Sequence, residues 1–175
     1  APKDEIELKN MLYSAMLSET GPYIIRYPRG YGEGTGWQTS EFEEYAAGKG
    51  EKLKDGEDIA VIAAGPFANR AVEAAEIVKE KTGRCPAIYN IRYIKPVDED
   101  MLEEICGKFD EIITIEDGCI TGGLYGCVAE YTAQRDKGIS ITPIAIPDSY
   151  LSQGTQENNF AISVCCFVIE IAINV

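Results

Sequence analysis

The chain has 175 residues, of which 45% are hydrophobic and 26% charged, enough for one globular domain and an additional segment. Its net charge of −13, from 29 acidic and 16 basic residues, repels nucleic acid and anionic membranes, so neither is an expected partner. The sequence contains no histidine, which excludes Ser-His and Cys-His nucleophilic sites and disfavours catalysis by this chain alone.

The first segment, residues 1–30, contains one predicted helix and one predicted strand. The helix begins at Asp4-Glu5, and the strand, residues 23–27, is stopped by Pro28. One helix and one strand cannot bury enough surface to fold alone, so we expect the end of a domain that begins in a longer parent. Apolar residues at helical spacing predict one inward face on the helix: Leu8, Met11, Leu12, Ala15 and Met16.

A Gly-rich linker, residues 31–47, leads to a segment in which strands and helices alternate. This alternation predicts an α/β fold: a mostly parallel five-stranded sheet with helices on both faces. An opening hairpin, 48–53 with 58–63, should add one antiparallel strand. The remaining predicted elements are a helix over 68–81, a strand over 87–93, a helix over 98–106, a strand over 112–115, a helix over 122–134 and a strand over 139–146.

The cysteines and the amino terminus bear on metal binding and location. The six cysteines form no C-x-x-C pair, so we expect no metal site. The amino terminus is polar and does not resemble a signal peptide. Four cysteines lie in or near apolar runs, as reduced core cysteines do, which fits a reducing cytoplasm. These four are Cys85, Cys106, Cys119 and Cys127.

The most specific motif is Arg26-Tyr27-Pro28-Arg29-Gly30, which directly follows the first predicted strand. Ligands of open α/β sheets gather at the carboxyl ends of strands, and two guanidinium groups there can grip a phosphate. Alternatively, both arginines pair with carboxylates of this acidic chain at a domain boundary. Residue type and position alone fit phosphate binding and ion pairing equally well.

Three other groups of residues are interpreted as structural. We expect the charges of Arg92–Lys95, at a strand exit, to pair locally rather than to touch a substrate or a partner subunit. Gly122–Gly126 opens a helix without a G-x-G-x-x-G pattern, which favours close packing, at a dimer contact for example, over anion binding. Glu116 and Asp117 have no histidine or nucleophile beside them, so we expect caps and ion-pair partners.

The order of the motifs resembles that of the 1-deoxy-D-xylulose-5-phosphate synthase family, in the transketolase superfamily. The motifs up to Gly30 are similar to the end of the family's pyrimidine-binding domain. The later motifs are similar to its transketolase C-terminal domain: Gly48-Lys49-Gly50, Arg92–Asp98, Ile115–Gly118, Gly122-Gly123, Pro147-Asp148 and Gln153–Glu157. The resemblance therefore divides the chain into 1–30, the linker 31–47, a C-terminal domain over 48–157 and an atypical apolar tail over 158–175.

The resemblance implies an enzyme that condenses pyruvate with glyceraldehyde 3-phosphate, with loss of CO2, on thiamine diphosphate and Mg. The product feeds isoprenoid, thiamine and pyridoxal phosphate synthesis. Arg29 matches the family's arginine that binds the phosphate of the acceptor substrate, and Arg26 is expected to form a structural ion pair. The family's cofactor-binding and catalytic residues lie upstream. We therefore expect this chain to hold no cofactor, metal or catalytic residue and to be inactive alone.

The implied partners are the amino-terminal domains of the parent and the second subunit of a homodimer. Two other interpretations stay open. The chain could be the matching region of a transketolase or of a 2-oxo acid dehydrogenase β subunit, or a stand-alone interaction module that pairs with a separate catalytic subunit. The tail, too short to span a bilayer comfortably, is a buried closing element, a swapped strand or the product of an altered reading frame.

Overall fold

The computed structural model describes residues 1–19, 21–28, 30–135, 138–150 and 154. Arg29 and the apolar tail, on which two of the predictions fall, lie outside these residues. Within the described ranges, no helix is long and apolar enough to cross a membrane. The elements are α1 (Glu5–Leu17), β1 (Glu51–Lys54), β2 (Ile59–Ala63), α2 (Phe67–Thr82), β3 (Pro86–Asn90), α3 (Glu99–Lys108), β4 (Glu111–Cys119), α4 (Leu124–Thr132) and β5 (Ser140–Ile146).

The five strands form one sheet in the order β1-β3-β2-β4-β5. Strand β1 runs antiparallel to β3, whereas the other neighbouring pairs are parallel. The predicted sheet, mostly parallel with one antiparallel strand, is confirmed. The predicted hairpin is wrong, because β1 pairs with β3 and not with β2. The loop between β1 and β2 instead crosses the start of β3, where the Glu57 N–H donates to the carbonyl oxygen of Cys85 at 2.9 Å.

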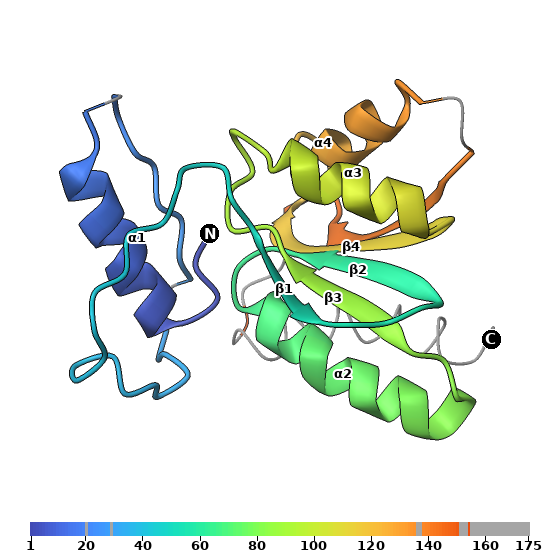
Figure 1. Cartoon of the computed structure of the whole chain (residues 1–175), viewed down its shortest axis with the longest axis horizontal. Coiled ribbons are helices and arrows are strands. Elements are labelled where there is room, and N and C mark those ends of the chain that lie inside the picture. The colour runs from blue at the N-terminus through green and yellow to red at the C-terminus, as the bar shows by residue number, and fades with distance from the viewer. Residues whose placement is uncertain (20, 29, 136–137, 151–153, 155–175) are drawn as a thin grey trace.

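Helices cover both faces of the sheet, as predicted. Helix α2 lies on one face, and α3 and α4 lie on the other (Figure 1). Alanines and Phe67 of α2 pack on the first face, and Leu102, Ile105, Leu124 and Val128 pack on the second. The helix ends follow their local chemistry. Gly83 ends α2 in the left-handed conformation, with φ 77°, and the Asp98 side chain caps α3 by accepting from the Met101 N–H.

The amino-terminal segment stands beside this α/β domain (Figure 1) and differs from its prediction in two ways. The inward face of α1 is mainly polar, whereas Leu12 is 50% and Met16 is 85% exposed. The predicted strand over 23–27 does not form. A strand is stable only beside a partner, and within the described residues no other strand lies alongside this segment. Of the predicted helix and strand, only the helix is present.

The prediction of core cysteines holds for one residue among the four that the structure describes. Cys106, on α3, is 3% exposed and belongs to the core under α3 and α4. Cys85, Cys119 and Cys127 are half-buried. Their apolar neighbours in the sequence therefore did not place these three side chains in the centre of the domain.

Candidate functional site

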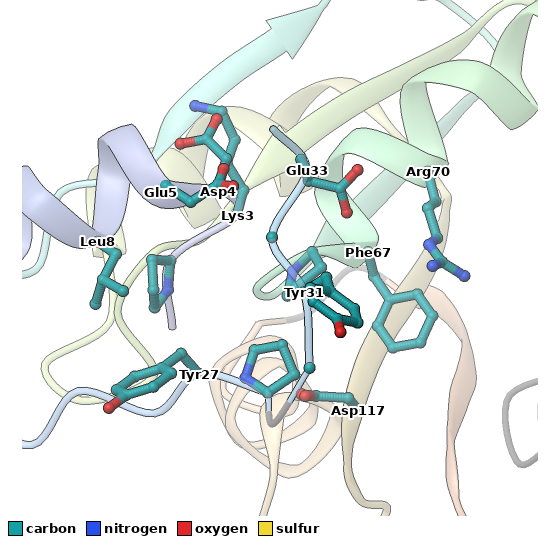
Figure 2. A pocket seen from close by; sticks show the side chains of 15 residues that line it. Lys3, Asp4, Glu5, Leu8, Tyr27, Tyr31, Glu33, Phe67, Arg70 and Asp117 are labelled. Atoms are coloured by element: carbon teal, nitrogen blue, oxygen red, sulfur yellow. The ribbon is translucent and has the colours of Figure 1, made fainter. Parts of the chain in front are cut away.

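A cavity of about 290 Å³ lies where the carboxyl edge of the sheet meets the amino-terminal segment (Figure 2). Its walls come from the start of α1, from the Tyr27–Glu33 region, from the start of α2 and from the end of β4. The side chains labelled in Figure 2 around it are Lys3, Asp4, Glu5, Leu8, Tyr27, Tyr31, Glu33, Phe67, Arg70 and Asp117. This is the sheet edge at which open α/β proteins hold their ligands.

The Arg26–Gly30 motif reaches this cavity. Tyr27, Pro28 and Gly30 line the cavity, and Arg29 lies outside the described residues. The Arg26 guanidinium pairs with the carboxylate of Asp117 at the end of β4. This contact confirms the predicted structural ion pair of Arg26.

The lining of the cavity is more acidic than basic. Asp4, Glu5, Glu33 and Asp117 outnumber the cationic lining residues, Lys3 and Arg70. The Glu5 carboxylate accepts from the Gly34 N–H at 2.9 Å and from the Thr35 hydroxyl at 2.8 Å, and these bonds hold the pKa of Glu5 below its usual value.

This arrangement does not suit a diphosphate with its metal ion. A metal-bound diphosphate needs unpaired cations for its phosphate groups and free carboxylates for the metal. In this lining Lys3 is paired with Glu51 at 2.7 Å, and Asp4 is engaged as the N-cap of α1. Among the residues that the structure describes, no three His, Cys, Asp or Glu side chains gather as metal ligands. The part of the chain seen here therefore offers no place for a metal-bound diphosphate cofactor.

The end of β4 is built around the buried carboxylate of Glu116, which is 4% exposed. This carboxylate accepts from the Tyr125 N–H at 3.1 Å, in the first turn of α4. A Cβ at Gly123 would lie 2.2 Å from Glu116 Oε2, so the carboxylate needs a glycine there. The helix start therefore holds an anion supplied by the chain itself. The predictions that Glu116 is a cap and Asp117 an ion-pair partner are confirmed.

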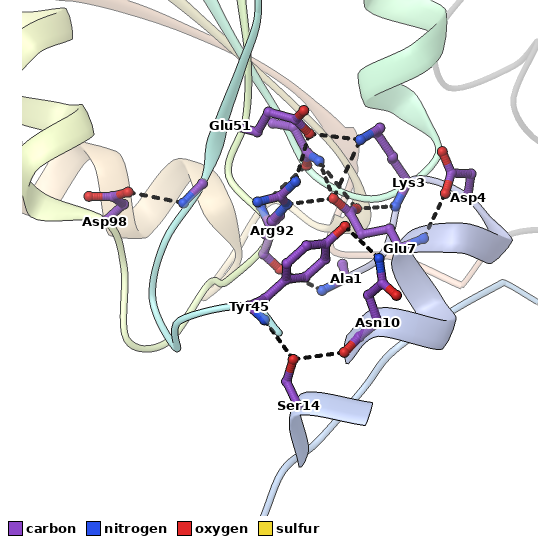
Figure 3. Close-up of polar contacts among 12 residues, drawn as sticks. Ala1, Lys3, Asp4, Glu7, Asn10, Ser14, Tyr45, Glu51, Arg92 and Asp98 are labelled. Carbon is purple, nitrogen blue, oxygen red and sulfur yellow. Dashed lines mark hydrogen bonds and ion pairs between the residues drawn. The ribbon is translucent and has the colours of Figure 1, made fainter. Parts of the chain in front are cut away.

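A second contact between the amino-terminal segment and the domain is centred on Arg92 (Figure 3). Its Nε donates to Glu7 Oε1 at 2.6 Å, and its Nη2 donates to Glu51 Oε2 at 2.8 Å. Its guanidinium lies over the Tyr45 ring, 4.1 Å from the centroid. Burial alone would lower the pKa of Arg92, but the bonds to Glu7 and the charge of Glu51 outweigh it and raise the pKa.

As predicted, Arg92 pairs with charges of this chain, but the pairing is not local in the sequence, because its partners lie 85 and 41 positions away. The residue adopts a φ of 53°, which non-glycine residues seldom do. Two residues before it, the Asn90 side chain donates to Glu7 Oε1 at 2.9 Å. The exit of β3 is therefore shaped to bind the polar face of α1.

The same polar face of α1 binds the linker. The Glu43 N–H donates to Asn10 Oδ1 at 3.2 Å, and the Tyr45 N–H donates to Ser14 Oγ at 2.7 Å. The sequence did carry a signal for this face, since Glu7, Asn10 and Ser14 follow helical spacing. The polar face was not predicted, because the apolar residues at helical spacing indicate a different inward face.

Acid should weaken the contact around Arg92. Burial alone would raise the pKa of Glu51, but Lys3 and Arg92 outweigh it and hold the pKa below 4.5. Stability from a lowered carboxyl pKa is present above 4.5 and is lost as the pH falls through the folded-state value. We expect Glu51→Gln to cost about 0.5–1 kcal/mol at pH 7, a difference that shrinks below pH 4.5 in urea unfolding measurements. A difference that stays constant with pH would contradict this assignment.

Comparison with known proteins identifies the family to which the domain is similar. The family described as "Transketolase, C-terminal domain" matches residues 48–165. The 1-deoxy-D-xylulose-5-phosphate synthase of Bacteroides thetaiotaomicron is 43% identical over 155 residues, which are 89% of this chain and 24% of that protein. The synthase of Cytophaga hutchinsonii is 41% identical over 157 residues, also 89% of this chain and 24% of the relative.

The chain thus spans about a quarter of the length of the curated relatives it matches. Among solved structures, the one described as "Split gene transketolase, inactive beta4 tetramer" superposes with a TM-score of 0.67 at 22% identity. The superposition covers 75% of this chain and 43% of that one, and at this identity it supports the fold alone. The matched residues include all five strands and α2 to α4. The chain therefore belongs to the transketolase C-terminal domain family.

Proposed function

We propose that this chain is the carboxy-terminal part of a 1-deoxy-D-xylulose-5-phosphate synthase. The observation that carries the proposal is the 43% identity to such a synthase over 89% of the chain, which extends beyond the C-terminal domain. In the parent, the reaction would join pyruvate to glyceraldehyde 3-phosphate with loss of CO2. It would take place in the cytoplasm, within a homodimer, and supply isoprenoid, thiamine and pyridoxal phosphate synthesis.

In this proposal the chain contributes to acceptor binding but not to the chemistry of the cofactor. Thiamine diphosphate with Mg would supply the carbanion chemistry and would be held by other domains of the parent. The poor fit of the described residues to this cofactor supports that placement. Arg29 would bind the acceptor phosphate, since a guanidinium forms paired charge-assisted hydrogen bonds with phosphate oxygens. The exposed side chains of Leu12 and Met16 on α1 support a further part of the parent that covers them.

The test is kinetic and uses the full-length parent. Arg29→Ala should raise the KM for glyceraldehyde 3-phosphate about 10- to 100-fold, the equivalent of one or two charge-assisted hydrogen bonds. The KM for pyruvate should change less than about twofold, because Arg29 would bind only the acceptor. Arg84→Ala is the matched control, since Arg84 pairs with Glu111 at the start of β4, at the opposite edge of the sheet.

Three outcomes of these assays would contradict the proposal. An unchanged acceptor KM in Arg29→Ala would remove Arg29 from the site. A parent that uses ketose donors, or that oxidises 2-oxo acids, would favour a transketolase or a 2-oxo acid dehydrogenase β subunit. Turnover of pyruvate by the 175-residue chain alone would contradict its proposed inactivity.

A further inference from the structure

The Arg26–Pro28 segment is joined to the C-terminal domain through side chains. Within the described residues, the backbone from 21 to 28 forms no hydrogen bond to other backbone groups. Without a sheet ladder, other contacts must set the position of such a segment. The Arg26–Asp117 ion pair is such a contact, and it joins residues 91 positions apart.

Asp117 is held in place by the structure at the end of β4. The pairing of β4 with β5 shifts register between Ile115 and Cys119. Irregularities of this kind re-aim side chains and occur frequently beside functional sites. Here Glu116 turns inward to cap α4. Asp117 lines the cavity (Figure 2), and so does Pro28. The Asp117 side chain is 16% exposed, against 45% for Arg26, so the carboxylate is the more fixed partner.

We propose that Asp117 is a positioning residue, which fixes the Arg26–Pro28 segment against the carboxyl end of β4 by pairing with Arg26. The inference rests on the proposed function, in which the next residue binds the acceptor phosphate. The C-terminal domain would then influence acceptor binding through the Asp117 carboxylate. Displacement of the Arg26–Pro28 segment lowers the affinity for the acceptor phosphate and leaves the pyruvate site unchanged.

The test replaces Asp117 by the isosteric and neutral Asn in the full-length parent. We expect the acceptor KM to rise about 3- to 30-fold and the pyruvate KM to stay within about twofold, a separation that a general loss of stability would not produce. Arg26→Gln should give the same rise, and the double variant should be no worse than either single variant, because both remove one interaction. Asp148→Asn, an exposed aspartate just after β5, should leave both constants unchanged.

A second measurement is independent of activity. Backbone 15N relaxation of the 175-residue chain should give lower order parameters for residues 23–27 in Asp117→Asn and in Arg26→Gln than in the wild type or in Asp148→Asn. Unchanged order parameters would overturn the proposal, and so would lower order parameters with an unchanged acceptor KM. If the wild-type parent fails to use glyceraldehyde 3-phosphate, the proposed function fails. The order parameters then show by themselves whether Asp117 holds the segment.

Discussion

Arg92→Met is expected to lower the free energy of unfolding by about 3 kcal/mol, at the lower end of the range for breaking a buried ion pair. Glu7 is only 1% exposed, so removal of the guanidinium leaves its carboxylate in the interior without its closest cation. Lys3, with Nζ 3.6 Å from Glu7 Oε1, compensates in part, which is why the upper end of the range is not expected. Urea unfolding of the purified chain at pH 7 measures the change.

Two further variants make the Arg92 experiment decisive. Arg84→Met removes an arginine whose partner, Glu111, is largely exposed, and it should cost less than about 1 kcal/mol. Adding Glu7→Gln to Arg92→Met should recover part of the lost stability, because the unpaired buried charge disappears. A loss below about 1 kcal/mol in Arg92→Met would show that Lys3 and Asn90 suffice to hold Glu7.

The sequence was sufficient to predict the α/β domain because its signals are local. Continuous apolar runs mark the buried strands, and Gly83 and Asp98 mark helix ends, all within a few residues of the element they define. The partner of β1 was not predictable in this way. A short loop between β1 and β2 suits a hairpin. The pairing actually formed depends on contacts with β3, whose paired residues lie 34 to 39 positions further along the chain.

The candidate site shows the same division between local and distant signals. Arg29 was predicted from a resemblance of motifs and stays a prediction. The sequence predicted that Arg26 forms a structural ion pair, but it did not identify Asp117 as the partner. The polar inward face of α1 was missed because helical periodicity identifies an apolar stripe. It cannot show that Arg92, 85 positions from Glu7, makes the polar stripe the buried one.

Gly56→Ala is expected to destabilise the chain by about 3 kcal/mol, because the added methyl group has no space. A Cβ at this position would lie 2.3 Å from backbone atoms of Cys85, Pro86 and Ala87, which cannot turn aside as a flexible side chain does. On its other side the Gly56 carbonyl accepts from Lys108 Nζ at 2.8 Å, so the loop is held from two directions.

Gly107→Ala is the matched control for Gly56→Ala. A Cβ at Gly107, in α3, meets nothing within 4 Å, and alanine there should stabilise the helix by about 0.5–1 kcal/mol. Urea unfolding should give changes of opposite sign in the free energy of unfolding for the two variants. This result would show that the close backbone approach at Gly56, and not the loss of a glycine as such, destabilises Gly56→Ala. A Gly56→Ala chain as stable as the wild type would mean that the loop can leave β3. In that case β1, whose Glu51 binds Arg92, would not be fixed in the sheet through this contact.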